Sequence, residues 1–416
     1  MKIAIGAQPL ADARVSAPLL FLLTVLLGLQ PLSTDLYLPS LPQLAADLGV
    51  SAAAAQSTLS VFIAGFALMQ LVVGPLADRF GRRPVVLGGA LAYLAASVLG
   101  TFAPTLGWLV FARLGQSLGL CCTVLCARAI VRDLYDPEAG ARVLAHALGW
   151  MTLITLLGPI VGGGLSTLFG WRSAFATLSL VGAVLVATAF AWLPESNRHR
   201  NPRALAPRAL ASTYLEILRS RDFRAFALTG TGSYCALFSF ISGSSFVLIR
   251  VLGLTPTQYG VAFGVVTLGF LPGTLLTRRV QPVLGIRRTA MLGGAVACAA
   301  SLTMAALAFA GVQTVWAVVV PMFAMLFSHG LLQPTSQVGA IAAFPHAAGA
   351  AAALLGFLMH VAAALVGSWI GASLDGTTRP LAATIGAIGT ATAFAAFVLL
   401  RGPAAVAAEP ADAQRR

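Results

Sequence analysis

The sequence predicts an all-α integral membrane protein, with twelve transmembrane helices in two pseudo-symmetric six-helix bundles. The first reason is composition: of 416 residues, 58% are hydrophobic and 9% are charged, and the mean hydropathy is +0.89. Soluble domains carry about 25% charged residues, so this chain must expose apolar side chains to lipid. The second reason is the length of the apolar runs, which are near the ~20 residues of a spanning helix rather than the ~10 of a barrel strand.

Each apolar run predicts one span, because the backbone can satisfy its own hydrogen bonds in lipid only as a helix or a closed barrel. The first run is longer than the apolar core of a signal peptide, about 7–15 residues, so we expect it to be a span. An even number of spans places both termini on one side of the membrane. The twelve predicted spans are residues 17–39, 54–77, 85–103, 106–128, 143–168, 172–193, 223–249, 257–280, 289–310, 313–337, 349–374 and 378–400.

The loops decide the orientation. The odd-numbered loops carry only Arg172, Arg250 and Arg379. The termini and even-numbered loops carry Lys2, Arg14, Arg79, Arg82, Arg83, Arg132, Arg142, Arg198, Arg200, Arg203, Arg208, Arg219, Arg221, Arg278, Arg279, Arg287, Arg288, Arg401, Arg415 and Arg416. Positive residues stay in the cytoplasm, which predicts a multi-pass protein of the bacterial inner membrane with both termini cytoplasmic. The net charge of +13 is then a topology signal, and we expect no nucleic-acid partner.

A polar linker, residues 194–221, divides the chain into an N-terminal bundle, 1–193, and a C-terminal bundle, 222–416. The two halves repeat weakly between their second and third spans. GPLADRFGRRPVVLGG begins at Gly74, and GTLLTRRVQPVLGIRRTAMLGG begins at Gly273. Parallel repeats with a central site between them are typical of major facilitator transporters.

The first copy of this repeat is a tight turn in which glycines allow close backbone approach. A generic charged loop explains its arginines but not its Gly/Asp/Gly spacing. The stretch resembles the loop between spans two and three of the major facilitator superfamily. The resemblance implies that Asp78 docks on the opposite half near the start of span eleven, that Arg82 pairs with Asp133, and that both latch the outward-facing state. The implied gating residues are Gly74, Asp78, Arg79, Gly81, Arg82 and Asp133.

A second motif lies in span five and consists of Gly149, Gly158, Pro159, Gly162 and Gly163. Small residues let helices approach closely in lipid, and proline kinks a helix. Ordinary tight packing of helices explains the presence of these small residues. The spacing also resembles the antiporter signature of the superfamily, which is found in drug–proton exchangers. This resemblance favours export over uptake.

Two charges lie inside apolar runs, Asp35 in span one and Arg113 in span four. Intramembrane charges are costly and usually functional. Desolvation favours a protonated carboxyl and a nearby arginine favours an ionised one, so a pair at matching depth predicts a proton switch. A static ion pair, or an Asp35 at the outer water interface beside Pro39, are the alternatives.

Four further stretches sharpen the resemblance: PLSTDLYLP from Pro31, RLGQ from Arg113, VRDLY from Val131 and FPHAAG from Phe344. Together they resemble the Bcr/CflA branch of drug–proton antiporters over nearly the whole chain. The resemblance implies that Asp35 is the proton-coupling acid and Arg113 its partner. Some multidrug relatives carry a second acid about two turns earlier in span one. Leucines and Gly28 occupy that region here, which argues against cationic drugs.

Polar and aromatic residues on the predicted spans are candidates for a substrate cavity. Interhelical hydrogen bonds and core packing are equally good explanations for each of them. His329 and His360 are also intramembrane groups that could handle protons. The cavity candidates are Gln30, Tyr37, Gln116, Tyr234, Phe238, Gln333, Gln337 and His360.

These observations predict a monomeric, proton-coupled antiporter that exports small neutral or zwitterionic drugs or metabolites by alternating access. Its partners would be the small-molecule substrate, protons and the lipid bilayer. The proton gradient would supply energy without a cofactor or metal. A proton-coupled symporter importing a metabolite is the alternative on the same fold. A receptor, an enzyme and a pore are disfavoured, since the sequence shows no sizeable signalling domain, no cluster of ligand residues and no ring of charges.

Overall fold

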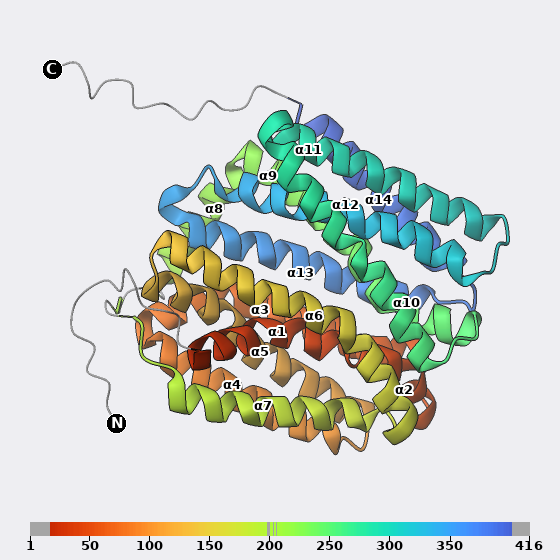
Figure 1. Ribbon diagram of the computed structural model, residues 1–416, viewed down its shortest axis with the longest axis horizontal. Coiled ribbons are helices and arrows are strands. Elements are labelled where there is room, and N and C mark those ends of the chain that lie inside the picture. Colours follow the sequence, from red (N-terminus) through yellow and green to blue (C-terminus); the bar gives the residue numbers. More distant parts are fainter. Residues whose placement is uncertain (1–16, 198–199, 203, 205, 402–416) are drawn as a thin grey trace.

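The computed structural model describes residues 17–401 apart from 198, 199, 203 and 205. Part of the predicted topology signal, namely Lys2, Arg14, Arg198, Arg203, Arg415 and Arg416, therefore lies outside the described residues. So do the outer ends of the two predicted bundles. The described residues form a succession of long helices (Figure 1).

The first half, up to the linker, contains α1 Ala17–Asp35, η1 Leu38–Ser40, α2 Leu41–Asp47, α3 Ala52–Phe80, α4 Arg82–Thr101, α5 Leu106–Leu134, α6 Pro137–Phe169 and α7 Arg172–Trp192. The linker contains a helix that the sequence did not predict, α8 Pro207–Arg219. The second half contains α9 Arg221–Ser245, the π-helical turn η2 Phe246–Val251, α10 Pro256–Leu268, α11 Phe270–Phe309, α12 Val315–Ile341, η3 Pro345–Ala347, α13 Ala348–Ser373 and α14 Arg379–Leu399.

Eleven helical stretches in the described part of the chain are long and apolar enough to cross a membrane. The longest, Pro256–Phe309, has 54 residues and covers two of the predicted spans. Inside it Gly285 has φ 75°, a left-handed conformation that interrupts the helix and that glycine adopts without steric cost. The chain is thus a multi-pass membrane protein.

Local chemistry starts several helices where the sequence changes from loop to apolar run. Ser51, Asp136 and Thr314 each accept a hydrogen bond from a backbone amide in the first turn of the following helix. Thr255 and Gln258 form a reciprocal capping box at the start of α10. Such caps satisfy amides that have no partner within the helix.

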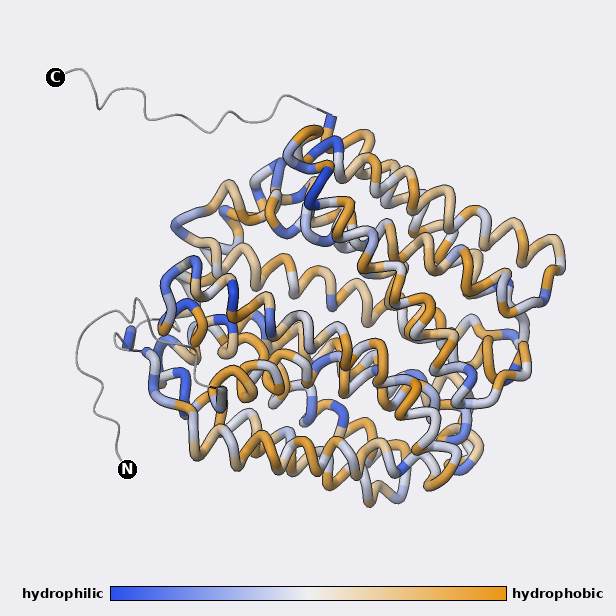
Figure 2. Tube along the Cα trace, in the orientation of Figure 1, coloured by the Kyte–Doolittle hydropathy of each residue, from blue (hydrophilic) through white to orange (hydrophobic). Residues whose placement is uncertain are grey.

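The helices before the linker pack mainly on one another, and so do the helices after it. Two close pairs join the halves, α3 with α13 and α6 with α10. Hydrophilic residues gather toward the ends of the helices, and apolar residues predominate along their lengths (Figure 2). One end carries the α3–α4 turn, the α5–α6 turn and the linker, and we call it the arginine-rich end.

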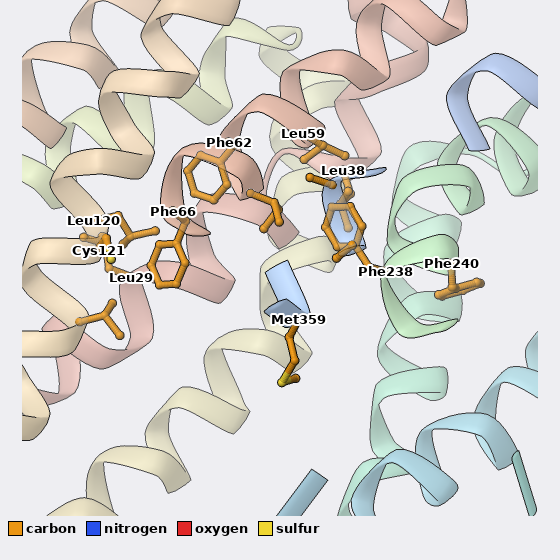
Figure 3. Packing of buried hydrophobic residues seen from close by; sticks show 14 of the residues in the cluster. Leu29, Leu38, Leu59, Phe62, Phe66, Leu120, Cys121, Phe238, Phe240 and Met359 are labelled. Atoms are coloured by element: carbon orange, nitrogen blue, oxygen red, sulfur yellow. The ribbon is translucent and has the colours of Figure 1, made fainter. Parts of the chain in front are cut away.

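A continuous core of buried apolar side chains runs through both halves. Figure 3 shows Phe62 and Phe66 of α3 in this core together with Phe238 of α9 and Met359 of α13. Apolar side chains of the two halves therefore make up much of the contact between them. Any polar group placed there is costly unless it has a partner.

Candidate functional site

Asp35 is the last residue of α1 and is buried, with 4% of its surface exposed. Its Oδ1 accepts a hydrogen bond from the Thr34 hydroxyl at 3.0 Å. A side chain at Gly158 of α6 would approach the Asp35 Cβ to 3.2 Å. Gly163, five residues further along α6, lies against Pro256 of α10 in the second half. The carboxyl therefore lies where α1, α6 and the second half meet.

Arg113 of α5 is completely buried within the first half. Its Nη1 donates to the Ser33 carbonyl at 3.0 Å and to Gln116 Oε1 at 3.1 Å, while Nε and Nη2 have no partner among the described residues. Cation–π contacts, worth up to about 2 kcal/mol when desolvated, offset part of the cost of burying this charge. The three rings, whose centres lie 4.0, 5.0 and 5.1 Å from the guanidinium carbon, are Tyr37, Phe62 and Phe175.

The predicted pairing of Asp35 with Arg113 is not present in this structure. The ion pairs between described residues involve other side chains. The reason is the rotation of α1: Arg113 binds the carbonyl of Ser33, and residues two apart are about 200° apart around a helix. Asp35 therefore faces the second half while Arg113 remains on the other side of α1.

The span-five glycines lie at the junction that Asp35 occupies. A Cβ at Gly162 would collide with the Leu36 carbonyl, and one at Gly163 would collide with the Pro256 carbonyl of α10. In the other direction, a Cβ at Gly260 of α10 would collide with the Pro159 carbonyl. The motif thus forms a close backbone contact between α6 and α10. Gly149, by contrast, has open space around its Cα and takes no part in this contact.

Other contacts close the same end of the molecule, opposite the arginine-rich end. Arg250 of η2 donates to the Pro42 carbonyl of α2 at 2.5 Å. Gly371 of α13 packs against Gln56 near the start of α3. At the arginine-rich end, by contrast, nothing lies within 4 Å of a Cβ built at Gly74 of α3 or Gly349 of α13. The halves are joined at one end and separate toward the other.

The predicted ion pair between Arg82 and Asp133 forms, with Nε 3.1 Å from Oδ2. Arg82 also contacts Asp78 at 2.6 Å within the same turn. Docking of Asp78 on span eleven, which the resemblance implied, is not seen here, and the Asp78 side chain is 48% exposed. The cause is the separation of α3 from α13 at this end. Gly81 turns the chain between α3 and α4 with φ 105°, a conformation that glycine tolerates.

The linker holds this turn in a way that the sequence did not reveal. Glu195 Oε1 accepts from the Arg82 amide at 2.9 Å, at the N-terminus of α4, where a carboxylate is favoured. Asn197 Nδ2 donates to the carbonyls of Ala77 and Asp78 at the end of α3. Arg79 stacks on the ring of its neighbour Phe80 at 5.3 Å and takes no part in the ion pairs of the turn.

Two intrahelical prolines receive side-chain compensation. Pro75 cannot bond the Leu71 carbonyl four residues earlier, and the Tyr214 hydroxyl of α8 donates to that carbonyl at 3.1 Å. In the second half, Pro334 likewise leaves the Gly330 carbonyl without its helical amide, and the Thr277 hydroxyl donates to it at 3.0 Å. Thr277 takes the position that Asp78 has in the first half, but its task here is structural.

A small polar and aromatic cluster joins the halves near mid-span. Gln30 Nε2 of α1 lies 3.5 Å from His360 Nε2 of α13, and His360 Nδ1 contacts the Gly356 carbonyl at 2.7 Å. The His360 ring lies 5.0 Å from the Phe66 ring and 5.1 Å from the Tyr234 ring. Gln30, Tyr234 and His360 are thus brought together as candidates for substrate contact.

Of the remaining cavity candidates, some lie away from this cluster. Tyr37 bonds Thr58 at 2.9 Å and Gln116 bonds Ser97 at 2.8 Å, both completely buried inside the first half. Their polarity serves the surroundings of Arg113, which explains why intramembrane polarity alone misplaced them.

The candidates of the second half differ from one another. Phe238 stacks on Tyr234 at 6.4 Å and extends the cluster. Gln333 has a buried Oε1 without a hydrogen-bond partner among the described residues, and Gln337 is exposed. His329 bonds Ser233 at 2.8 Å and lies 6.4 Å from the Tyr234 ring.

Comparisons with known proteins show the family to which this chain belongs. A profile of the Major Facilitator Superfamily matches residues 23–368, most of the chain. The chain belongs to the major facilitator superfamily. Membership makes it a membrane transporter of small molecules and excludes the enzyme alternative. Among solved structures, its fold resembles that of a peptide transporter POT in complex with sulfate. The TM-score is 0.75 at 16% identity, and the match covers 92% of this chain and 93% of that one.

Among the relatives of this facilitator is a "Bicyclomycin resistance protein homolog" of Haemophilus influenzae, 26% identical over 88% of this chain and 93% of the relative. Another is "Multidrug resistance protein D" of Escherichia coli, 28% identical over 84% of this chain and 87% of the relative. A bacterial homologue of the lysosomal transporter Spinster, in an inward-facing and occupied conformation, has TM-score 0.70 at 18% identity and covers 94% of this chain and 98% of that one. The resemblance to the Bcr/CflA branch is confirmed.

Sequence reasoning missed three residues of this facilitator. Tyr214 and Glu195 lie in the linker, which the sequence analysis treated only as a connection. Arg128 is the last residue of the predicted span 106–128 and lies well within α5, and the sequence analysis assigned it no role. The sequence did contain a signal for Arg128. No proline interrupts the 29 residues of α5, so the helix continues past position 128 to Leu134.

Proposed function

We propose that this protein is a proton-coupled antiporter that exports small drugs or metabolites across the bacterial inner membrane. Resistance proteins among its relatives support export. The arginines of its even-numbered loops support a cytoplasmic arginine-rich end and cytoplasmic termini. The protein acts as a monomer and needs no cofactor.

The proposal includes twelve spans in two six-helix bundles, because the longest helical stretch is long enough to hold two spans. Its 54 residues would reach about 81 Å at 1.5 Å per residue, whereas the hydrocarbon core is about 30 Å thick. The interruption at Gly285 lies between arginines on both sides, Arg279 and Arg287. Two spans separated by a cytoplasmic turn satisfy both observations.

The observation that carries the proposal is the position of Asp35. It is a buried carboxyl without a cationic partner among the described residues, at the junction of α1, α6 and the second half. An isolated carboxylate is costly in such surroundings, so the neutral form suits the closed junction. When the halves separate there, water reaches the carboxyl and the proton exchanges. Coupling by alternating access requires that the carboxyl be closed off from water in one state and exchange its proton with water in the other.

The gating turn supports the direction of movement. The halves meet at the end opposite the arginine-rich end, and in the proposed orientation that end is periplasmic, so the proposed transporter would receive its substrate from inside. In the reverse state Asp78 would approach α13, while Arg82 and Asp133 stay paired. Gly158, Gly162 and Gly163 permit the periplasmic closure by removing side chains from the contact.

Everted membrane vesicles test the function. A pH-sensitive dye reports the proton gradient while neutral and zwitterionic antibiotics and metabolites are added to vesicles with the wild type, Asp35→Asn or Asp375→Asn. We expect a compound to collapse the gradient with the wild type and with Asp375→Asn, whose carboxyl lies in an exposed loop, but not with Asp35→Asn. Equal responses from all three proteins remove Asp35 from coupling. Accumulation of a labelled metabolite in intact cells, without any vesicle response, supports the import alternative.

A further inference from the structure

A groove lies between α3, α4 and α5, and every residue that lines it belongs to the first half. Its lining consists of apolar residues, glycines and one cysteine, without a charged side chain. Its volume is about 390 Å³, within the range of roughly 300–1,000 Å³ in which proteins hold small molecules. Phe80 of α3 and Leu118 of α5 belong to the lining and are 48% and 37% exposed. The groove therefore opens on the surface of the protein.

Glycines of α4 and α5 create this groove. A Cβ at Gly119 of α5 would collide with the Gly89 carbonyl of α4, so these two glycines let the helices lie close together. Beside them, a Cβ built at Gly88 meets nothing within 4 Å. Protein interiors are otherwise close-packed. The space next to this close helix contact is thus left open because Gly88 has no side chain.

The open side of the groove faces the hydrocarbon of the bilayer. Its three helices are among those long and apolar enough to span a membrane. Leu91, next to the lining residue Ala92 of α4, is exposed, and so is Phe111, about two turns from Leu118 on the same face of α5. Contiguous exposed apolar side chains of this kind mark a surface that contacts lipid. An acyl chain is therefore the molecule that the surroundings supply to fill the groove.

The groove begins at the arginine-rich end. Pro84, in the first turn of α4, and Ala92 both line it, and eight residues of helix extend over about 12 Å. At its mouth the guanidinium carbon of Arg79 lies 5.3 Å from the centre of the Phe80 ring, which belongs to the lining. A cation thus lies at the end where a lipid headgroup would be, and apolar residues extend from it toward the middle of the membrane.

Arg79 is the arginine of the α3–α4 turn that remains available to a ligand. Arg82 binds two acids, and Arg83 donates to the Phe190 carbonyl of α7 at 3.1 Å. Arg79 is exposed and forms no ion pair with the described residues. An exposed guanidinium beside an apolar groove complements a molecule with an anionic head and an apolar tail.

We propose that the groove binds an anionic phospholipid, with an acyl chain between α3, α4 and α5 and the phosphate at Arg79. The guanidinium suits a phosphate because it can bind two of the oxygens through parallel hydrogen bonds. In the proposed orientation this end faces the cytoplasm, where the leaflet carries anionic lipids. The site lies apart from the space between the halves and is additional to the proposed transport function.

Native mass spectrometry of the purified full-length protein in detergent tests this site. Phosphatidylglycerol and phosphatidylcholine with identical acyl chains are the two probes. We expect the wild type to bind phosphatidylglycerol about fivefold more tightly, as for one arginine near a membrane surface. Arg79→Gln should remove this preference and keep the binding of phosphatidylcholine. Arg142→Gln, which removes a charge at another exposed position, is its control and should keep the preference.

Gly88→Leu tests the groove itself, because a leucine fills the space that the acyl chain would take. We expect it to weaken the binding of both lipids by about tenfold or more, since methylene groups of the chain lose their contacts. Ala95→Leu adds the same side chain at an exposed position of α4 outside the groove and should bind both lipids as the wild type does. Leu118→Trp blocks the groove from its rim, and it decides the test where thermal unfolding shows that Gly88→Leu does not fold.

Unchanged binding of both lipids by Gly88→Leu and Leu118→Trp would overturn the proposal, and so would a wild type without preference for phosphatidylglycerol. If Arg79→Gln retains the preference, the assignment of the phosphate to Arg79 is wrong. A second copy of the chain is the other occupant to test. Loss of a dimer mass in Gly88→Leu without a change in lipid binding would identify that copy and contradict the lipid site. These measurements involve no proton transport, so their failure is distinguishable from failure of the proposed function.

Discussion

At the scale of single residues, two charges of the first half have opposite surroundings. Asp35 faces the junction between the halves and has one hydrogen bond from its neighbour Thr34. Arg113 is enclosed by aromatic rings and donates through Nη1 alone. The burial of Arg113 is tolerated because the flat guanidinium stacks on rings and bonds oxygen at the same time. Its place is therefore fixed by shape as much as by charge.

Replacing Arg113 by lysine keeps the charge and removes the planar group. We expect Arg113→Lys to lower stability by about 1–3 kcal/mol, because an ammonium cannot stack on the rings and reach both oxygen acceptors. Thermal unfolding of the purified protein in detergent measures the loss. Arg379→Lys, at an exposed position, is the control and should unfold as the wild type does. An unchanged unfolding temperature for Arg113→Lys would show that charge alone matters there.

At the scale of elements, the contact of α6 with α10 depends on glycine at both helices. Gly163 meets the Pro256 carbonyl, and Gly260 meets the Pro159 carbonyl. Carbonyl groups of the backbone cannot move aside as a flexible side chain can. Closure of the end at which α6 meets α10 is therefore sensitive to a single methyl group at these positions.

The adjacent glycines of α6 provide a matched pair for a test. A Cβ at Gly163 collides with α10, while one at Gly164 meets nothing within 4 Å. We expect Gly163→Ala to disfavour closure of the end at which α6 meets α10, by about 1–3 kcal/mol for an overpacked contact, and Gly164→Ala to leave that end closed. Labelling of a cysteine at the buried position Ser242, in a variant without the five native cysteines, reports the opening. Equal labelling rates in the two alanine variants would contradict the importance of this contact.

At the scale of the whole molecule, the linker makes specific contacts and is not only a connection. Its first residues bind the α3–α4 turn through Glu195 and Asn197. Its helix α8 reaches α3 through Tyr214 and the second half through Glu216, which lies 3.8 Å from His346. The linker thus touches both halves at the end where they separate.

The hydrogen bond of the Tyr214 hydroxyl allows a direct test of whether the linker helix is held against α3. Burial raises the pKa of this phenol, so the hydroxyl stays protonated at neutral pH and can donate. Tyr214→Phe leaves the Leu71 carbonyl unbonded, and we expect a loss of about 1 kcal/mol at this contact with faster proteolysis of the linker. Tyr135→Phe is the control, because the Tyr135 hydroxyl has no hydrogen bond among the described residues. Identical cleavage rates for both variants would show that the contact does not hold α8.

The spans and several contacts of this protein could be predicted from sequence patterns that involve residues close together along the chain. Composition requires lipid-facing helices, and apolar runs place the spans to within a few residues. The pair of Arg82 with Asp133 was implied by the family resemblance, and it forms where α4 begins and α5 ends. The span-five glycines were predictable as a site of close helix packing because small residues let helices approach closely in lipid, but only packing shows that Gly163 meets α10 and Gly164 does not.

Tertiary structure alone decided which way the polar groups face. Sequence spacing fixes the depth of a residue, at 1.5 Å per position, but not the rotation of its helix against the neighbours. Asp35 and Arg113 match in depth and still face away from each other. The bond from Tyr214 to the carbonyl freed by Pro75 joins residues far apart in sequence, so only packing could bring the donor to that acceptor.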